Sequence, residues 1–134
     1  MLNVQIVDDE PIIRMGLNKL INWEELGFEV ACMAQNGKQA LEQLELESID
    51  LIITDIEMPV MNGLDFIKEV REKNRNVEIV ILTAYDDFEY AKTAIRYGIT
   101  QYILKPIEEK EVVKMLLDIR ESIQAKRLSK YDFE

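Results

Sequence analysis

The stretch "VQIVDDEP", Val4 to Pro11, places an apolar run directly before the adjacent carboxylates of Asp8 and Asp9. The run contains several β-branched residues and predicts a buried strand. Pro11 suits the first turn of a helix, because its fixed φ matches the helical value and its missing N–H is not needed there. The stretch therefore predicts a strand, a short acidic turn and a helix, in that order.

The same alternation continues along the chain. Asn-Gly pairs at residues 36–37 and 62–63 predict turns, and Gly98 predicts a left-handed helix end. Strand-like runs occupy residues 3–7, 28–33, 49–54, 77–82 and 101–104, and segments with helical periodicity occupy residues 11–22, 38–47, 64–73, 88–97 and from about 107 onward. Right-handed crossovers return every strand in the same direction, so the pattern predicts an α/β fold: a doubly wound five-stranded parallel sheet with five alternating helices.

The length and composition of the chain exclude several classes of function. A chain of 134 residues, 48% of them hydrophobic, is expected to form one domain with its own core. A net charge of −10 argues against DNA binding by this domain, because non-specific affinity for DNA comes from Lys and Arg at phosphates. The chain has no histidine, which excludes Ser/His and Cys/His catalysis and histidine-bound zinc or iron.

Neither a secretion signal nor a membrane span is expected. No basic segment precedes an apolar one at the N-terminus, and no apolar run approaches membrane-spanning length. The single cysteine, Cys32, lies in a strand-like run, where a small buried hydrophobe is expected. A cytoplasmic protein without membrane contact is the resulting prediction.

Chemically active side chains follow four of the predicted strands: Asp8 and Asp9, then Asp55, Thr83 and Lys105. Parallel strands end at one edge of a sheet, and ligands bind beside the point where the strand order reverses. Carboxylates about 4 Å apart repel by about 4 kcal/mol per pair at an effective dielectric near 20. Hard oxygen ligands without His or Cys indicate a divalent cation, Mg²⁺ best. With Lys105 as a second positive group, the set suits a phosphoryl group, with Asp55 as nucleophile.

A structural alternative exists for each of these residues alone. An acid that follows a strand is often only a helix cap, and Asp9 before Pro11 fits that role. A shared proton could also relieve the repulsion between the acids. The combination of acids, a hydroxyl and a lysine at successive strand ends favours the phosphoryl site.

The segments "VDDE", "DLIITDIEMPVMNGLDF", "VILTAY" and "YILKPI" occur in this order over residues 2 to 121, and in this the chain resembles the receiver domain of a two-component response regulator. The resemblance implies a flavodoxin-like sheet with strand order 2-1-3-4-5. It also implies a receiver domain over residues 1–121, followed by a helix extension or linker over residues 122–134 toward an absent output domain.

The resemblance also assigns roles to the metal and phosphoryl ligands. Asp55 is then the phosphoacceptor, Asp9 binds Mg²⁺ directly, and Asp8 helps through water. The backbone carbonyl of Glu57 completes the protein ligands of the metal. Lys105 pairs with the acquired phosphoryl group, and its bond to the following proline is expected to be cis.

Two further residues are implied as the switch. Thr83 would hydrogen-bond the phosphoryl group and pull the loop after its strand inward. Tyr102 could then turn into the vacated space, or it is simply an amphipathic tyrosine of an edge strand.

The resemblance also implies that Glu57 and Tyr85 occupy the positions that tune the access of water to the acyl phosphate. Both side chains are large, which predicts slow self-dephosphorylation.

The phrases "NWEELGFEV" and "AYDDFEYAKTAIRYGITQYILKPI" are similar to the subfamily whose receiver precedes an AraC-type helix-turn-helix output. DNA would then be bound through that output domain. The last predicted helix carries an apolar face past residue 121, formed by Val112, Leu116, Ile119 and Ile123. Residues 122–134 are either the frayed end of a core helix or a linker helix.

The resulting hypothesis is a phosphoacceptor signalling switch, and not an enzyme with an external substrate. Its partners are a sensor histidine kinase and a second copy, bound through the fourth helix, the fifth strand and the fifth-helix face near Arg96, Tyr97 and Tyr102. One alternative is a magnesium-dependent phosphatase with an aspartyl nucleophile, in which Glu57 takes the general-acid position. The other is a pseudo-receiver that acts only as a scaffold.

Overall fold

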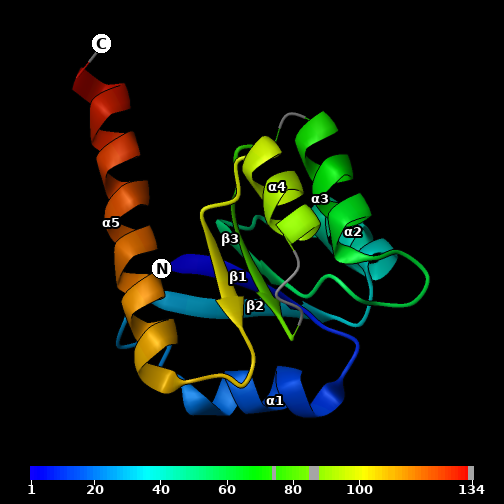
Figure 1. Cartoon of the computed structure of the whole chain (residues 1–134). Helices are drawn as coiled ribbons and strands as arrows, with labels where there is room; N and C mark the ends of the chain where they lie inside the picture. Colours follow the sequence, from blue (N-terminus) through cyan, green and yellow to red (C-terminus); the bar gives the residue numbers. More distant parts are fainter. Residues whose placement is uncertain (74, 85–87, 133–134) are drawn as a thin grey trace.

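The structure is a computed structural model that describes residues 1–73, 75–84 and 88–132. Strands and helices alternate along the described chain (Figure 1), as the periodicity predicts. The strands are β1 (Leu2–Val7), β2 (Phe28–Ala34), β3 (Leu51–Thr54), β4 (Glu78–Thr83) and β5 (Gln101–Leu104). The helices are α1 (Pro11–Leu20), α2 (Gly37–Leu46), α3 (Gly63–Glu72), α4 (Phe88–Arg96) and α5 (Glu109–Asp132).

The strands form one five-stranded sheet in the order β2-β1-β3-β4-β5, and every neighbouring pair is parallel. The order reverses at β1, which pairs with β2 on one side and with β3 on the other. This confirms the predicted doubly wound, flavodoxin-like topology. It also puts the ends of β1 and β3 side by side, where such sheets bind ligands.

Helices cover both faces of the sheet: α1 and α5 lie on one side, and α2, α3 and α4 on the other (Figure 1). Strand β3 shows why its apolar run is continuous. Leu51 and Ile53 pack into the core beneath α1 and α5, whereas Ile52 packs beneath α2 and α3. A strand buried on both faces needs apolar residues at every position.

Both Asn-Gly pairs begin helices, so the predicted turns are wrong at these positions. The side chain of Asn36 accepts a hydrogen bond from the backbone N–H of Gln39, and Asn62 accepts one from Asp65. Each asparagine is therefore a helix N-cap, which satisfies a backbone N–H that has no partner within the helix. The other prediction for a glycine is confirmed, since Gly98 follows α4 with a φ of 67°.

The first and last helices differ in how completely their apolar residues are buried. Near the end of α1, Leu17 and Ile21 are buried, but Leu20 is 40% exposed. In α5 the predicted face is buried throughout: Val112, Leu116, Ile119 and Ile123. The helix continues past this face to Asp132.

The extension of α5 contacts the edge of the sheet where the strands begin, here called the amino edge. Lys126 Nζ lies 2.7 Å from Glu78 Oε1, at the start of β4. Arg127 Nη2 lies 3.0 Å from Asp50 Oδ1, just before β3. The helix is thus attached to the domain beyond its last buried residue. Within the described residues, no helix is both long enough and apolar enough to span a bilayer.

Candidate functional site

The acids predicted from the strand ends meet at the opposite edge of the sheet, here called the carboxyl edge. Asp8 and Asp9 follow β1, and Asp55 follows β3. One carboxylate oxygen from each of these residues, and one from Glu10, lie within 4.8 Å of one another. The predicted convergence of Asp8, Asp9 and Asp55 is therefore confirmed, and Glu10 is an addition to the cluster.

The backbone around Asp55 is held from several sides. Its N–H donates to the Val7 carbonyl at 2.9 Å, and its Oδ1 accepts the N–H of Ile56 at 2.7 Å. Gly63 packs against the same segment so closely that a Cβ there would lie 1.9 Å from the Asp55 carbonyl oxygen. Asp55 is 5% exposed, and its Oδ2 lies 3.0 Å from the Lys105 Nζ.

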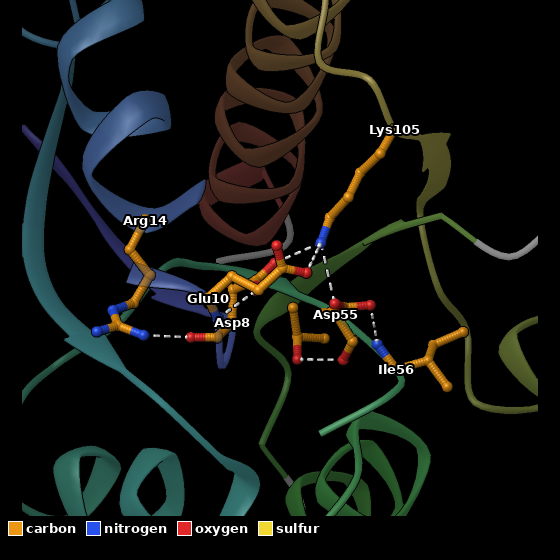
Figure 2. A network of polar contacts seen from close by, with 7 residues as sticks. Asp8, Glu10, Arg14, Asp55, Ile56 and Lys105 are labelled. Atoms are coloured by element: carbon orange, nitrogen blue, oxygen red, sulfur yellow. Dashed lines mark hydrogen bonds and ion pairs between the residues drawn. The ribbon is translucent and has the colours of Figure 1, made fainter. Parts of the chain in front are cut away.

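Lys105 brings the positive charge to this edge, immediately after β5. Its Nζ lies 3.0 Å from Asp55 Oδ2, 2.9 Å from Asp8 Oδ2 and 3.8 Å from Glu10 Oε1 (Figure 2). Burial by itself lowers the pKa of Lys105, but hydrogen bonds and charges from Asp8 and Asp55 outweigh it and raise the pKa. Lys105 is therefore a permanent cation at neutral pH.

Asp8 is the most buried member of the cluster, at 2% exposure. Burial raises its pKa, the charge of Asp55 adds to that, and the bonds from Lys105 and Glu10 only partly oppose it. Its Oδ1 accepts the backbone N–H of Glu10 at 2.9 Å. Its Oδ2 has the ion pair with Lys105 but no well-directed hydrogen bond within the described residues. A buried carboxylate oxygen in this state has room for another positive ligand.

The donor set fits Mg²⁺. The cluster offers carboxylate oxygens only, because the chain has no histidine and Cys32 lies within β2. Three of the four acids, Asp8, Glu10 and Asp55, form ion pairs with Lys105, the one cation paired with the cluster in the described part of the chain. Hard oxygen ligands with an excess of negative charge are what Mg²⁺ prefers. The residues that would hold it are Asp8, Asp9 and Asp55.

The remaining predicted residues lie on or directly after β4 and β5. Thr83 is fully buried at the end of β4, and its carbonyl accepts the Lys105 N–H at 2.8 Å. Tyr102 is half-buried on β5, beside Ile81 of β4, and packs against the core beneath α2, α3 and α4. The bond from Lys105 to Pro106 is cis, as expected. The switch roles of Thr83 and Tyr102 stay predictions, and Tyr85 lies outside the described residues.

Glu57 lies in the loop after Asp55, and its side chain is exposed. One of its carboxylate oxygens accepts a hydrogen bond from the hydroxyl of Tyr90 on α4. The side chain of Glu57 is thereby engaged with α4, and the use of its backbone carbonyl as a metal ligand stays a prediction.

Sequence reasoning missed Arg14, which belongs to the site. Its Nη1 donates to the backbone carbonyl of Asp8 at 2.6 Å (Figure 2). On the sequence alone Arg14 is one polar residue of an amphipathic helix. The only available signal was its place one turn inside a helix that starts at the acidic turn.

The chain belongs to the response regulator receiver domain family, whose model matches residues 4–117. It is 39% identical over 119 residues to the uncharacterized transcriptional regulatory protein YesN of Bacillus subtilis, a match that covers 89% of this chain and 32% of YesN. It is also 39% identical over 116 residues to the transcriptional regulatory protein HptR of Staphylococcus aureus, covering 87% of this chain and 45% of HptR.

A solved structure shares the fold closely. The receiver domain of AraT, a response regulator from Geobacillus stearothermophilus, superposes with a TM-score of 0.87 at 36% identity, covering 94% of this chain and 98% of that one. The chain spans less than half the length of YesN and HptR. It is therefore similar to one domain of these regulators.

Proposed function

We propose that this chain is the phosphoacceptor switch of a two-component system, in which Asp55 accepts a phosphoryl group from a sensor histidine kinase. The observation that carries the proposal is the position of Asp55. Its buried carboxylate lies 3.0 Å from the Lys105 ammonium, among acids whose charge exceeds that of the lysine. Membership of the receiver domain family supports the same function.

In the proposed step, an Asp55 carboxylate oxygen attacks the phosphorus of a phosphohistidine or of a small acyl phosphate. The new O–P bond forms as the bond to the imidazole nitrogen, or to the acyl oxygen, breaks, and the leaving group keeps that electron pair. No general base is needed, because a carboxylate nucleophile has no proton to lose when it attacks. The main contributions of the protein are position and neutralisation of charge.

The residues around Asp55 supply these contributions. Mg²⁺, when bound by Asp8, Asp9, Asp55 and the carbonyl of Glu57, supplies positive charge to the phosphoryl oxygens. Lys105 pairs with another of these oxygens. The acquired group carries a charge of about −1.5 to −2 and attracts the hydroxyl of Thr83.

The movement of Thr83 is proposed to reach Tyr102 through the loop after β4, and so to change the surface formed by α4, β5 and α5. That surface would pair with a second copy near Arg96 and Tyr97. To shift the domain from a mostly inactive to a mostly active conformation, the activating interactions must favour the active conformation by about 5.5 kcal/mol. Dimerisation would supply part of it.

The signal is proposed to control transcription in the cytoplasm, through an output domain joined to this one. YesN and HptR are named as transcriptional regulatory proteins and are longer than this chain. An AraC-type helix-turn-helix domain that binds DNA is the proposed output. Residues 1–121 would be the receiver, and residues 122–134 the linker toward that domain, with α5 continuous across the boundary.

The test is incubation of the chain with acetyl phosphate and Mg²⁺, followed by intact mass measurement of the wild type and Asp55→Ala. The proposal predicts one phosphoryl group per chain in the wild type and none in the variant. Many turnovers of a phosphate ester would instead indicate a phosphatase. An unlabelled wild type would leave a scaffold without phosphoacceptor activity.

A further inference from the structure

Arg14 connects the first helix to the acidic turn and has no role in the proposed step. It lies in α1, four residues after Glu10, and both its own N–H and that of Ile13 donate to the Glu10 carbonyl. Its guanidinium reaches back toward the start of the helix and ends on the Asp8 carbonyl, 2.6 Å away. Among the described residues this is the one hydrogen bond of the Arg14 side chain, which forms no ion pair there.

The bond fixes the peptide group that joins Asp8 to Asp9. The N–H of Asp8 donates to the Ala34 carbonyl of β2 at 3.0 Å, which holds the amino side of Asp8. Arg14 holds its carbonyl. The carbonyl of Asp8 and the N–H of Asp9 lie in one rigid plane, so a fixed carbonyl direction also fixes where the Asp9 Cα begins. With the start of Asp9 fixed in this way, only the rotations within Asp9 still set the direction of its carboxylate.

The other side of the turn has its own constraint. Oδ1 of Asp8 accepts the N–H of Glu10, closing a small turn around Asp9. Asp9 is thus bracketed by a side-chain bond from Asp8 and by the guanidinium bond to the carbonyl of Asp8. None of these bonds involves the Asp9 carboxylate, which stays available to a ligand.

We infer that Arg14 is a positioning residue for the metal site, and that its bond to the Asp8 carbonyl aims the Asp9 carboxylate at Mg²⁺. This inference rests on the proposed function, because it assumes that the cluster binds Mg²⁺. The positioning role and a purely electrostatic role of Arg14 predict opposite changes in Mg²⁺ affinity when Arg14 is removed. A nearby positive charge repels Mg²⁺, so a purely electrostatic Arg14 weakens binding and its removal tightens it. A positioning Arg14 strengthens binding, and its removal weakens it.

The experiment is calorimetric titration of Mg²⁺ into the wild type, Arg14→Met and Arg14→Lys. Arg120→Met is the matched control, because Arg120 is also half-buried and donates one Nη1 bond, of 2.9 Å, to the Leu26 carbonyl far from the acids. We expect Arg14→Met to bind Mg²⁺ about tenfold more weakly, the lower end of what loss of an outer-shell partner costs a metal site. Arg14→Lys keeps the positive charge and a hydrogen-bond donor, so we expect its affinity for Mg²⁺ to lie between those of the wild type and Arg14→Met. Arg120→Met binds as the wild type does.

Phosphorylation by acetyl phosphate provides a second readout. If Arg14 only positions Asp9, Arg14→Met needs more Mg²⁺ for half-maximal labelling, but its rate at saturating Mg²⁺ returns close to that of the wild type. Unchanged or tighter Mg²⁺ binding by Arg14→Met, or equal weakening in Arg120→Met, overturns the inference while leaving the proposed function intact. A wild type that binds no Mg²⁺ overturns the proposed function itself.

Discussion

The two edges of the sheet carry the same kinds of charged side chain in different arrangements. At the amino edge each acid has its own cation: Glu78 pairs with Lys126, and Asp50 with Arg127. At the carboxyl edge four acids lie close together, and three of them share the single cation of Lys105. The first arrangement is electrically balanced and attaches α5 to the domain. The second leaves excess negative charge, which lowers the stability of the fold. Such an unbalanced cluster is typical of a functional site, where a bound cation or a transferred group offsets the charge.

Gly63 packs tightly against the backbone of Asp55 at the carboxyl edge, so its substitution is expected to have the largest effect on stability. Gly63→Ala would place a Cβ 1.9 Å from the Asp55 carbonyl oxygen, so the backbone must move. We expect a loss of about 3 kcal/mol in the free energy of unfolding, at the upper end for overpacking, together with slower labelling of Asp55. Urea unfolding measures the first and intact mass the second.

Gly16→Ala is the control for this substitution. Gly16 lies in α1, and a Cβ there would meet nothing within 4 Å. The substitution is expected to stabilise the chain by about 0.5–1 kcal/mol, because alanine loses less backbone entropy in a helix. Equal stability of Gly63→Ala and Gly16→Ala would refute the close packing behind Asp55.

The comparison of the two edges is tested most simply by matched lysine substitutions. Lys105→Met removes the cation shared by Asp8 and Asp55 and leaves these carboxylates buried together. Breaking a buried pair costs about 3–5 kcal/mol, and proton uptake by the acids reduces this to about 2 kcal/mol. Lys126 is 71% exposed in its side chain, so Lys126→Met is expected to cost about 0.5 kcal/mol. Urea unfolding without Mg²⁺ measures both losses.

Repeating the unfolding of Lys105→Met and Lys126→Met with added Mg²⁺ separates the two edges further. Added Mg²⁺ neutralises the cluster, so it is expected to restore part of the stability lost in Lys105→Met and to leave Lys126→Met no closer to the wild type. Equal losses in the two variants would mean that the edges do not differ in charge balance.

The smallest expected effect is a pH dependence at the amino edge. Burial alone would raise the pKa of Glu78, but hydrogen bonds from Lys126 and Thr100 and nearby positive charges lower it. A lowered folded-state pKa contributes stability above the unfolded value, roughly pH 4.3, and that contribution is lost as pH falls through the folded pKa. We expect Glu78→Gln to be less stable than the wild type at pH 7 by about 0.5 kcal/mol, since Lys126 is largely exposed.

At a pH below the lowered folded-state pKa of Glu78, the difference between Glu78→Gln and the wild type is expected to vanish, because the wild-type carboxylate is then protonated. Thermal unfolding across this range measures it. A difference that widens on acidification would contradict the assigned direction of the pKa.

The sequence predicted the carboxyl edge better than the amino edge, for a physical reason. Parallel strands end together, so residues that follow strands must meet, and the alternation of apolar runs predicts where strands end. The pairs at the amino edge join residues 48 and 77 positions apart. With 26 acids and 16 bases in the chain, composition does not select them.

Local chemistry accounts for the other differences. Asn36 and Asn62 carry the side-chain acceptor that both a turn and a helix start can use, and the helix that follows each decides between them. Arg14 was missed because its partner is a backbone carbonyl, which every residue possesses. Unlike a helix cap, a bond from an arginine to a backbone carbonyl outside its helix leaves no pattern in the sequence.

The most direct test of the central claim is a crystal structure of this chain with Mg²⁺ and beryllofluoride, a mimic of the phosphoryl group. We expect Mg²⁺ to be bound by Asp9, Asp55 and the Glu57 carbonyl. We also expect beryllofluoride on Asp55, within hydrogen-bond distance of Lys105 and Thr83. A cluster that binds neither group, or beryllofluoride attached elsewhere, would contradict it.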